Sequence, residues 1–435
     1  MKRQIVGITS ILIVSMLVLS ACSGVSAALS KTANQIVAQA VSATPTQAAL
    51  SSSSSSSSSG SSSTSTTTTT TSPAITGGSD LLSAYESTLE SIYSTVSPQV
   101  VNIMVLSPAS NSNNFQNFPG FGNNNNNQSQ QLSQALGSGF VWDTKGDIVT
   151  NNHVVDGATK IEVTFSDGTT VPATIVGQDP YSDLAVIKVD VSADKLSPVT
   201  MADSAQVKVG EIAIAIGNPY GFEGSMTVGT VSGLGRDLPT SQVDQTSGAS
   251  YSIPDVIQTD ASINPGNSGG VLVNDLGQVI GVTSALESAS GSSSGIGFAI
   301  PSEIVSKVVP SLISTGKYDH PYLGISGTDV TPDIAQAMNL PSDTRGALVE
   351  QVTTGGPADK AGLKASETVV TVNGVQGTVG GDVITAIDGH TINSMSDLIA
   401  YLAINTQVGQ TVSLTILRNG QTQTVQLTLG NRPSQ

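Results

Sequence analysis

The chain is organised around one glycine-rich stretch, Asn264-Pro265-Gly266-Asn267-Ser268-Gly269-Gly270. Its single serine stands among three glycines, shortly before the strand-like run Val271-Leu272-Val273. Glycines at this density let the backbone adopt conformations that side chains forbid, so that N–H groups can converge on one small space. A serine hydroxyl is a weak nucleophile and needs a base, together with donors for the oxyanion that it creates. The stretch is therefore either a nucleophile turn or an ordinary tight turn, and a base elsewhere in the chain would decide between them.

One of the three histidines is placed to be that base. His153 lies in Thr150-Asn151-Asn152-His153-Val154-Val155, just after a predicted strand, and an imidazole titrates near neutral pH. His320 sits in a polar connector before a proline, and His390 follows an Asp-Gly turn. We expect these two to be solvated surface histidines.

A carboxylate is also needed to orient the base. Asp183 begins the apolar run Asp183-Leu184-Ala185-Val186-Ile187-Lys188-Val189, where the strand would fix its position. Asp156, Asp167 and Asp179 occur in turn-like contexts and remain alternatives. The residues by themselves favour Asp183.

Composition bounds the classes of protein that need to be considered. The 435 residues are enough for two or three domains. The net charge of −16 argues against a nucleic-acid partner, since such partners are bound by clustered Lys and Arg. One cysteine cannot form an intramolecular disulfide, so the fold must depend on core packing. We predict no metal and no cofactor.

The first 22 residues read as an export signal. Met1-Lys2-Arg3 precedes an apolar run, residues 5–19, that is too short to span a membrane as a helix. The run ends in Leu19-Ser20-Ala21-Cys22, which resembles a bacterial lipobox and implies lipidation of Cys22. The alternative is an ordinary signal peptide with a chance cysteine.

Residues 23–79 are rich in Ser, Thr and Ala, with homopolymeric tracts at 51–59 and 66–71. Such a segment buries too little apolar surface to offset the entropy of ordering, so we predict a disordered tether with a reach of about 40 Å. The next apolar residues recur at helical spacing up to Val96, which predicts an amphipathic helix that packs on its own domain, with packing on a partner as the alternative. An Asn/Gln-rich loop follows at residues 111–131.

Short strands separated by turns then dominate, which predicts an all-β barrel or sandwich. A closing helix is predicted over 301–312, with Pro301 in its first turn. The predicted strands are 139–142, 147–150, 160–165, 171–176, 184–189, 211–216, 227–231, 256–259, 271–273, 279–284 and 297–300.

The order His153, Asp183, Ser268 is that of trypsin-like proteases, and the sequence motifs around these residues resemble those of the HtrA/Deg family. Those motifs are Gly137-Ser138-Gly139-Phe140, Thr150-Asn151-Asn152-His153-Val154-Val155, Ser182-Asp183-Leu184-Ala185-Val186, Gly217-Asn218-Pro219, Gln258-Thr259-Asp260-Ala261, the serine stretch itself and Gly297-Phe298-Ala299-Ile300-Pro301. The resemblance implies a mainly β fold with a chymotrypsin-like double β-barrel over residues 80–316. It also implies a catalytic triad in the cleft between the barrels.

The resemblance further implies an oxyanion hole at the backbone of Gly266, Asn267 and Ser268. Residues 235–253 and 289–295 would be loops whose order sets activity. A small apolar substrate pocket would be lined by Ile296, Gly297 and Phe298. Val271 departs from the family, which commonly has proline there.

A linker, 317–321, leads to a second resemblance, over residues 322–430. Tyr322-Leu323-Gly324-Ile325 is similar to the carboxylate-binding loop of a PDZ domain, a small α+β fold that binds peptide C-termini. Residues 356–363 and 381–389 resemble the middle of that domain. The insertion 365–380 departs from the family, and Asn373-Gly374 predicts that it folds as an extra hairpin with a type I′ turn.

These observations together predict an extracytoplasmic serine endopeptidase, anchored to a membrane by its lipid, that cleaves unfolded proteins. The family resemblance implies a homotrimer. Two alternatives remain open: an inactive peptide-binding chaperone or scaffold, and a selective regulatory protease.

Overall fold

The structure is a computed structural model that describes residues 78–108, 132–219, 221, 224–243, 250–285, 295–372 and 374–433. All described residues belong to one compact unit, Ile75–Gln435. The predicted signal peptide with Cys22, the tether up to residue 77 and the Asn/Gln-rich loop lie outside the described residues. Within the described part, no helix is long and apolar enough to cross a membrane.

Six antiparallel strands close the first barrel. Their order around it is β1 (Val100–Pro108), β2 (Leu132–Val141), β3 (Asp147–Thr150), β6 (Leu184–Val189), β5 (Thr170–Asp179) and β4 (Lys160–Thr164). The alternation predicted for residues 160–165 is confirmed, because Ile161, Val163 and Phe165 are buried in the barrel core while Lys160 is exposed. Period-two burial of this kind gives each strand one face toward the core.

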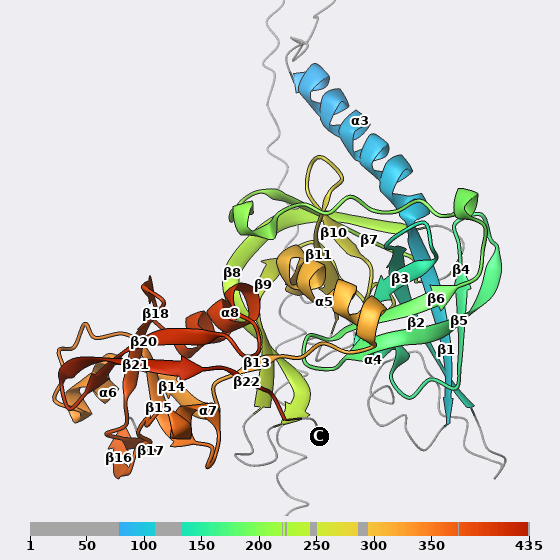
Figure 1. Ribbon diagram of the computed structural model, residues 1–435. Helices are drawn as coiled ribbons and strands as arrows, with labels where there is room; N and C mark the ends of the chain where they lie inside the picture. Colours follow the sequence, from blue (N-terminus) through green and yellow to red (C-terminus); the bar gives the residue numbers. More distant parts are fainter. Residues whose placement is uncertain are drawn as a thin grey trace, which may run out of the picture. The chain divides into compact units, whose positions relative to one another are not determined.

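A second barrel of the same size follows in the chain. Its strands run in the order β10 (Val271–Val273), β11 (Val279–Ser284), β12 (Gly297–Pro301), β9 (Ser250–Thr259), β8 (Ser225–Val243) and β7 (Ile212–Gly217). One hydrophobic cluster joins residues of both barrels, including Phe140 and Leu184 of the first and Ile214 and Val271 of the second. Figure 1 shows the two barrels side by side, so the predicted double barrel is confirmed.

The segment predicted as a regulatory loop, residues 235–253, is mostly strand. β8 and β9 extend far beyond the predicted 227–231 and 256–259 and pair as a long antiparallel arm with several register shifts. Glycine and proline in this segment, such as Gly233, Gly235 and Pro239, resemble turn signals in the sequence. In the structure they lie in or beside these bulged stretches, where such residues are tolerated within strands.

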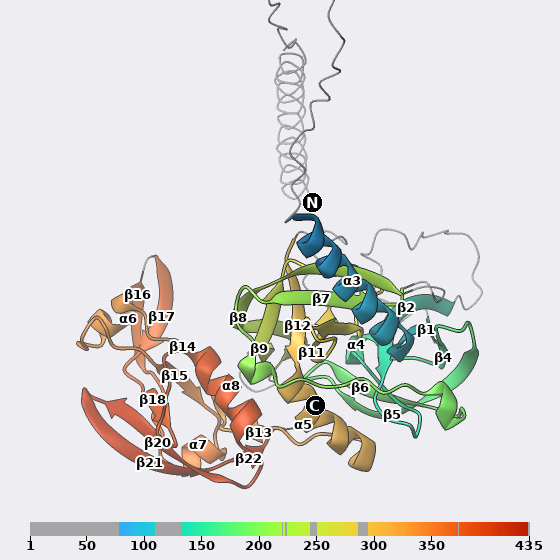
Figure 2. The ribbon, with the colours of Figure 1, turned by 90° about the horizontal axis from the view of Figure 1, so that it is seen from above.

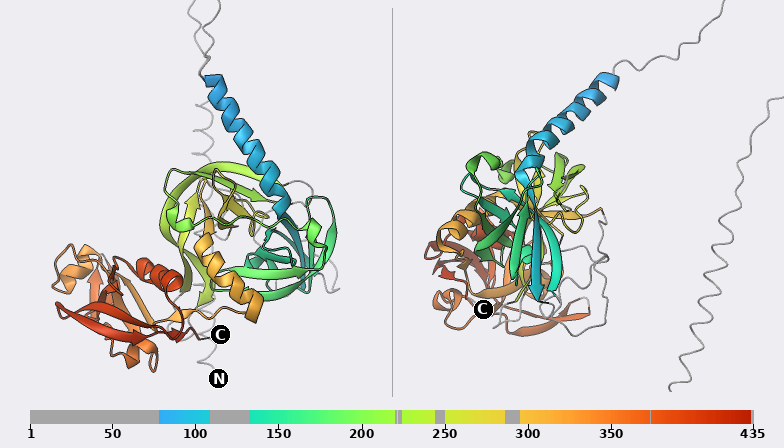
Figure 3. Two further views of the ribbon diagram at one scale, coloured as in Figure 1. Left: turned by 45° about the horizontal axis from the view of Figure 1, so that its top comes forward. Right: turned by 90° about the vertical axis from the view of Figure 1, so that its right-hand side faces the viewer.

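The helix α3 (Gly78–Val96) packs on its own domain only through its C-terminal part. Ile92 and Val96 are buried in the shared core, and Leu89 packs against it. By contrast, Leu81 at the N-terminal end is 75% exposed. Both views in Figure 3 show the helix leaving the barrel surface, so the predicted packing of the whole stripe is wrong for its first half.

A second helix, α5 (Ser302–Thr315), covers the barrels and leads into the linker. Pro301 is its N-cap rather than part of its first turn, and the helix runs three residues beyond the predicted end. Gly316 ends it in the left-handed conformation, with its N–H donating to Leu312 O at 3.0 Å. Short 3-10 helices cover Ser97–Gln99, Ala193–Lys195 and Ser204–Gln206.

The C-terminal domain is an α+β fold, as predicted. A sheet in the order β14 (Ile325–Asp329), β15 (Ala347–Val352), β18 (Val383–Ile387), β20 (Thr411–Arg418) and β21 (Gln421–Thr428) is extended by β19 (His390–Thr391). The helices are α6 (Pro332–Ala337), α7 (Pro357–Lys360) and α8 (Met395–Asn405), and β13 (Pro321–Tyr322) pairs with β22 (Gly430–Asn431). Figure 2 shows α8 running close to β14 and β15.

The insertion 365–380 folds as the predicted extra hairpin. β16 (Thr368–Val372) pairs with β17 (Val375–Val379), and the pairing of Val372 with Val375 leaves a two-residue loop. The insertion leaves and rejoins the domain at one hydrogen-bonded pair, since Asp382 N donates to Lys364 O at 3.0 Å and Lys364 N to Asp382 Oδ2 at 2.8 Å. Because its two ends meet, the insertion adds residues without separating the strands around it.

The ion pair between Asp382 and Arg418 is the contact whose loss we expect to destabilise the C-terminal domain strongly. The Asp382 carboxylate is fully buried and accepts from Arg418 Nε and Nη2, each at 2.7 Å. Removing one partner of such a pair leaves a buried charge uncompensated. We therefore expect Arg418→Met to lower the free energy of unfolding of this domain by about 3–5 kcal/mol in urea denaturation. Arg345→Met, at an exposed site of the same domain, should change it by under about 0.5 kcal/mol. Equal effects of the two substitutions would contradict the prediction.

Candidate active site

Asp183 occupies the last position of the turn between β5 and β6, in a conformation that few residues adopt. Its φ of 52° is left-handed, which costs an L-residue about 1–2 kcal/mol. Hydrogen bonds on both sides of the residue hold it there. Its carbonyl accepts from Asn152 N and from Asn151 Nδ2, both at 3.0 Å. Its buried carboxylate is thereby directed at His153.

His153 is held by this carboxylate through its ring and through its backbone. It lies in the one-turn helix α4 (Asn152–Val155) that follows β3. The ring Nδ1 lies 2.7 Å from Asp183 Oδ2, and the backbone N–H donates to Asp183 Oδ1 at 2.9 Å. With Nδ1 as the donor to the carboxylate, Nε2 carries the lone pair that a general base needs. The structure thus brings together the predicted base and acid.

The alternative acids are engaged elsewhere. Asp156 is exposed, and Asp167 pairs with Lys195 at 3.0 Å on the surface. Asp179 pairs with His320, and the side chain of this histidine, which was predicted to be solvated, is only 11% exposed. The prediction was wrong for His320, whereas His390 is exposed as expected.

Ser268 lies against the residues that lead to His153. Its carbonyl accepts from Ser138 N at 2.8 Å, and a side chain at the next residue, Gly269, would overlap Thr150 Oγ1. The serine Oγ accepts from Ala285 N at 3.1 Å, and no hydrogen bond joins it to His153 among the residues that the structure describes. Hydrogen bonds of this kind are often absent without substrate. Rotation about the Cα–Cβ bond redirects the hydroxyl.

The turn before the serine offers two N–H groups. Gly266 has a left-handed φ of 94°, and Asn267 N donates to Asn264 O at 2.9 Å. In the described part of the chain, neither Gly266 N nor Ser268 N donates to a protein acceptor. Both are therefore without a described protein acceptor at the turn where an oxyanion hole was predicted.

A network that joins the two barrels supports this turn. Ser138 Oγ of β2 donates to Gly266 O at 2.6 Å and accepts from Asn218 N at 2.8 Å. Asn102 of β1 in turn donates from Nδ2 to Asn218 O at 2.8 Å. The network gives a structural reason for two of the sequence motifs quoted above, because one contains Ser138 and the other contains Asn218. Sequence reasoning quoted both motifs without assigning either residue a role.

Two residues of the predicted substrate pocket, Gly297 and Phe298, lie on a strand close to the serine. They begin β12, where Phe298 pairs with Ser284 of β11. The residue after Ser284 is Ala285, whose N–H donates to Ser268 Oγ. Ile296 is 53% exposed. Residues 286–294 lie outside the described part.

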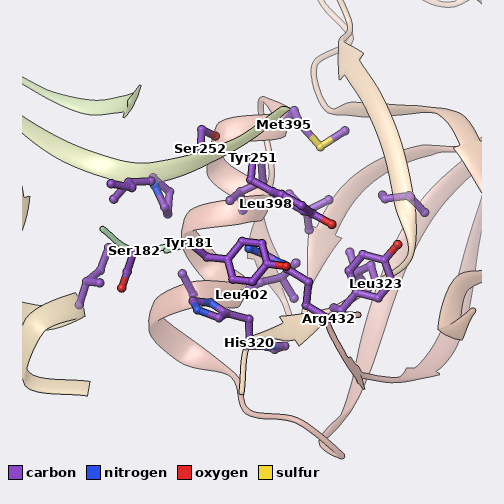
Figure 4. Close-up of a pocket in the computed structure, with 18 of the residues that line it drawn as sticks. Tyr181, Ser182, Tyr251, Ser252, His320, Leu323, Met395, Leu398, Leu402 and Arg432 are labelled. Carbon is purple, nitrogen blue, oxygen red and sulfur yellow. The ribbon is translucent and has the colours of Figure 1, made fainter. Parts of the chain in front are cut away.

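A second candidate site has β14 and α8 of the C-terminal domain on one side and residues of β9 and α5 of the double-barrel domain, such as Tyr251 and Ile304, on the other. The predicted loop 322–325 borders it, with Gly324 in a left-handed conformation at φ 80°. Apolar side chains line the groove, among them Leu323, Ile325, Met395, Leu398 and Leu402 (Figure 4). A groove between a strand with a free edge and a helix suits an extended peptide.

Comparisons with known proteins match both halves of the chain. A trypsin-like peptidase domain matches residues 137–282, and a PDZ domain matches residues 321–429. The chain is 40% identical over 305 residues to Protease Do-like 1, chloroplastic, of Arabidopsis thaliana, covering 70% of this chain and 66% of the relative. It is 39% identical over 301 residues to a probable periplasmic serine endoprotease DegP-like of Rhizobium meliloti (strain 1021), covering 69% and 54%.

Among solved structures, the chain is similar to the HtrA-type protease AlgW with a decapeptide. The identity is 34%, the TM-score is 0.58, and the match covers 79% of this chain and 98% of that one. The chain spans between about half and two thirds of the length of the two curated relatives above. Together with the geometry, these matches place the described residues in one family.

The network around Ser138 yields a prediction. Ser138→Ala removes the donor to Gly266 O and the acceptor of Asn218 N, which leaves one polar group of the turn and one of the neighbouring segment without partners. A loss of about 1–3 kcal/mol would lower the rate of peptide hydrolysis by about fivefold to 150-fold. The measurement is kcat with a fluorogenic peptide, with Ser232→Ala on the exposed face of β8 as control. An unchanged kcat in Ser138→Ala would show that the network does not support the turn.

Proposed function

Because the chain belongs to the HtrA family of trypsin-like serine proteases, we propose that it is a serine endopeptidase that cleaves unfolded or misfolded proteins of the cell envelope. The observation that carries the proposal is the double hold of Asp183 on His153, at 2.7 Å to the ring and 2.9 Å to the backbone. This hold lies beside the turn that presents Ser268. A fixed base next to a serine with free N–H donors is the arrangement that acyl transfer needs.

In the proposed reaction, Ser268 Oγ leaves the N–H of Ala285 and attacks the carbonyl carbon of the substrate. His153 Nε2 accepts the hydroxyl proton as the new C–O bond forms. The electron pair of the carbonyl moves to its oxygen, to which the N–H groups of Gly266 and Ser268 donate. His153 then passes the proton to the amide nitrogen as the C–N bond breaks, and water releases the acyl group by the same steps.

Order in the segments around the turn is the proposed control of activity. Asn267 is neutral, so it cannot form the carboxylate–ammonium pair by which digestive relatives are switched on. The segments that we propose to act instead are the arm formed by β8 and β9 and residues 289–295. The first of these segments is a pair of hydrogen-bonded strands rather than a loop. Binding of an effector to it could therefore change the position of these strands within the barrel.

Substrates are proposed to bind as extended chain. The pocket of Ile296, Gly297 and Phe298 favours a small apolar residue such as Val or Ala before the cut. Extended segments are accessible in unfolded proteins, which supports a role in protein quality control. The groove beside residues 322–325 is proposed to bind the C-termini of peptides, and the apolar side chains that line it favour an apolar last residue.

The proposed location is the cell envelope, with a lipid on Cys22 and residues 23–79 as a tether. The description of the Rhizobium meliloti relative as periplasmic supports an extracytoplasmic site. A homotrimer is the assembly that we propose. Sedimentation of the purified protein should give the mass of three chains, and a monomer would contradict the proposal.

Removal of the nucleophile separates the two proposed activities. We expect Ser268→Ala to lower hydrolysis of casein by roughly 10⁶-fold, because the acyl intermediate cannot form. Binding of a fluorescent peptide with a free C-terminus should be unchanged, because Ser268 does not line the groove. Loss of both activities would count against this division of roles.

Two further outcomes separate the alternatives. Casein left intact by the wild-type chain, with peptide binding retained, would favour an inactive scaffold. Cleavage of one folded protein in a panel, with casein left intact, would favour a selective regulatory protease. Digestion of casein and not of folded proteins is the result that quality control predicts.

A further inference from the structure

A buried carboxylate that takes no part in the proposed reaction lies four residues before the catalytic acid. Asp179 is the last residue of β5, and its side chain is 2% exposed. It accepts hydrogen bonds from Tyr181 N at 3.2 Å and from Ser182 Oγ. His320 Nε2 lies 2.9 Å from both carboxylate oxygens. A buried carboxylate is tolerated only with such partners, so these donors are the condition for its position.

The donors to Asp179 fix the same turn that carries Asp183. Tyr181 and Ser182 are its middle residues, and Asp179 pairs with Leu184 across the base of the turn. The turn is therefore held at its start by Asp179 and at its end by the bonds to the carbonyl of Asp183. A left-handed aspartate persists only where its surroundings over-determine it.

His320 belongs to the linker and is attached to the C-terminal domain. Its carbonyl accepts from Arg432 N at 3.0 Å, next to the pairing of β13 with β22. Its ring packs edge-on against Tyr181 and Tyr318, with centroids 5.3 and 4.8 Å away. Figure 4 shows His320, Tyr181 and Arg432 gathered at one end of the groove.

Neighbouring groups do not substitute for His320 as a donor to Asp179. Burial, and then the charge of Asp179, raise the pKa of Tyr318 to about 12, and among the described residues its hydroxyl makes no hydrogen bond to Asp179. The guanidinium of Arg432 lies over the rings of Tyr181 and Tyr251, at 4.8 and 4.4 Å from their centroids. Among the described residues, His320 is the donor to Asp179 that comes from outside the turn.

We propose that His320 is a positioning residue of the peptidase: by holding Asp179, it keeps the turn 180–183 in the form that directs Asp183 at His153. The proposal rests on the proposed function, since it concerns the rate of that reaction. It also ties the catalytic acid to the linker, and through Arg432 to the last strand of the C-terminal domain. A movement of the C-terminal domain would then be transmitted to the triad by the contact between His320 and Asp179, which are 141 residues apart in the sequence.

Three variants of the full chain test the proposal. His320→Phe keeps a ring and removes the donor, whereas His320→Gln keeps an N–H donor at a similar reach from the backbone. His390→Phe is the matched control, because this exposed histidine lies in the C-terminal domain. The measurements are kcat and KM with a fluorogenic peptide, binding of a C-terminal peptide, and hydrogen exchange of residues 180–183 by mass spectrometry.

We expect His320→Phe to lower kcat by about tenfold or more and to give faster exchange at residues 180–183, whatever its effect on peptide binding, because His320 also lines the groove. His320→Gln should recover most of kcat, and His390→Phe should behave as the wild type. A purely structural role would lower the melting temperature in both His320 variants without this recovery.

Three results would overturn the proposal. One is an unchanged kcat in His320→Phe while the wild type hydrolyses the peptide. Another is a change in KM or peptide binding alone, which would assign His320 to the groove. A third is equal loss of kcat in His320→Gln and His320→Phe. Absence of hydrolysis by the wild type would instead overturn the proposed function, and this proposal with it.

Discussion

The left-handed conformation of Asp183 is the constraint on which the active site depends. It costs about 1–2 kcal/mol, and the bonds from Asn151 Nδ2 and Asn152 N to its carbonyl offset that cost. In return the carboxylate faces His153 and receives both its ring and its backbone N–H. A relaxed turn would lose both contacts together. The base is therefore fixed by backbone geometry as much as by charge.

The nucleophile depends on a different contact, because it belongs to the other barrel. Ser268 precedes β10 of the second barrel, whereas His153 and Asp183 follow strands of the first. Ser138 bridges the two through its hydroxyl and its N–H. Neither barrel alone contains the three residues of the proposed triad. The packing of one barrel on the other is thus a condition for the proposed reaction as well as for stability.

The residues that sequence reasoning identified are those with local signatures. Ser268 stands in a glycine turn, Asp183 at the start of an apolar strand, and Asn373-Gly374 between two β-rich runs; each pattern records a property of its own neighbourhood. The pairing of His320 with Asp179 has no local signature, because 141 residues separate the partners. The arm of β8 and β9 was missed for the opposite reason: its glycines and proline look like turns and act as bulges. Long-range partners and tolerated irregularities are decided by packing, which a single sequence does not display.

The site of covalent labelling by a fluorophosphonate tests the central claim most directly. Peptide mapping by mass spectrometry should place one adduct on Ser268. The rate of labelling should fall by orders of magnitude in Asp183→Asn, because the imidazole is then held in the wrong tautomer. An adduct on another serine, or labelling of Asp183→Asn at the rate of the wild type, would contradict the account.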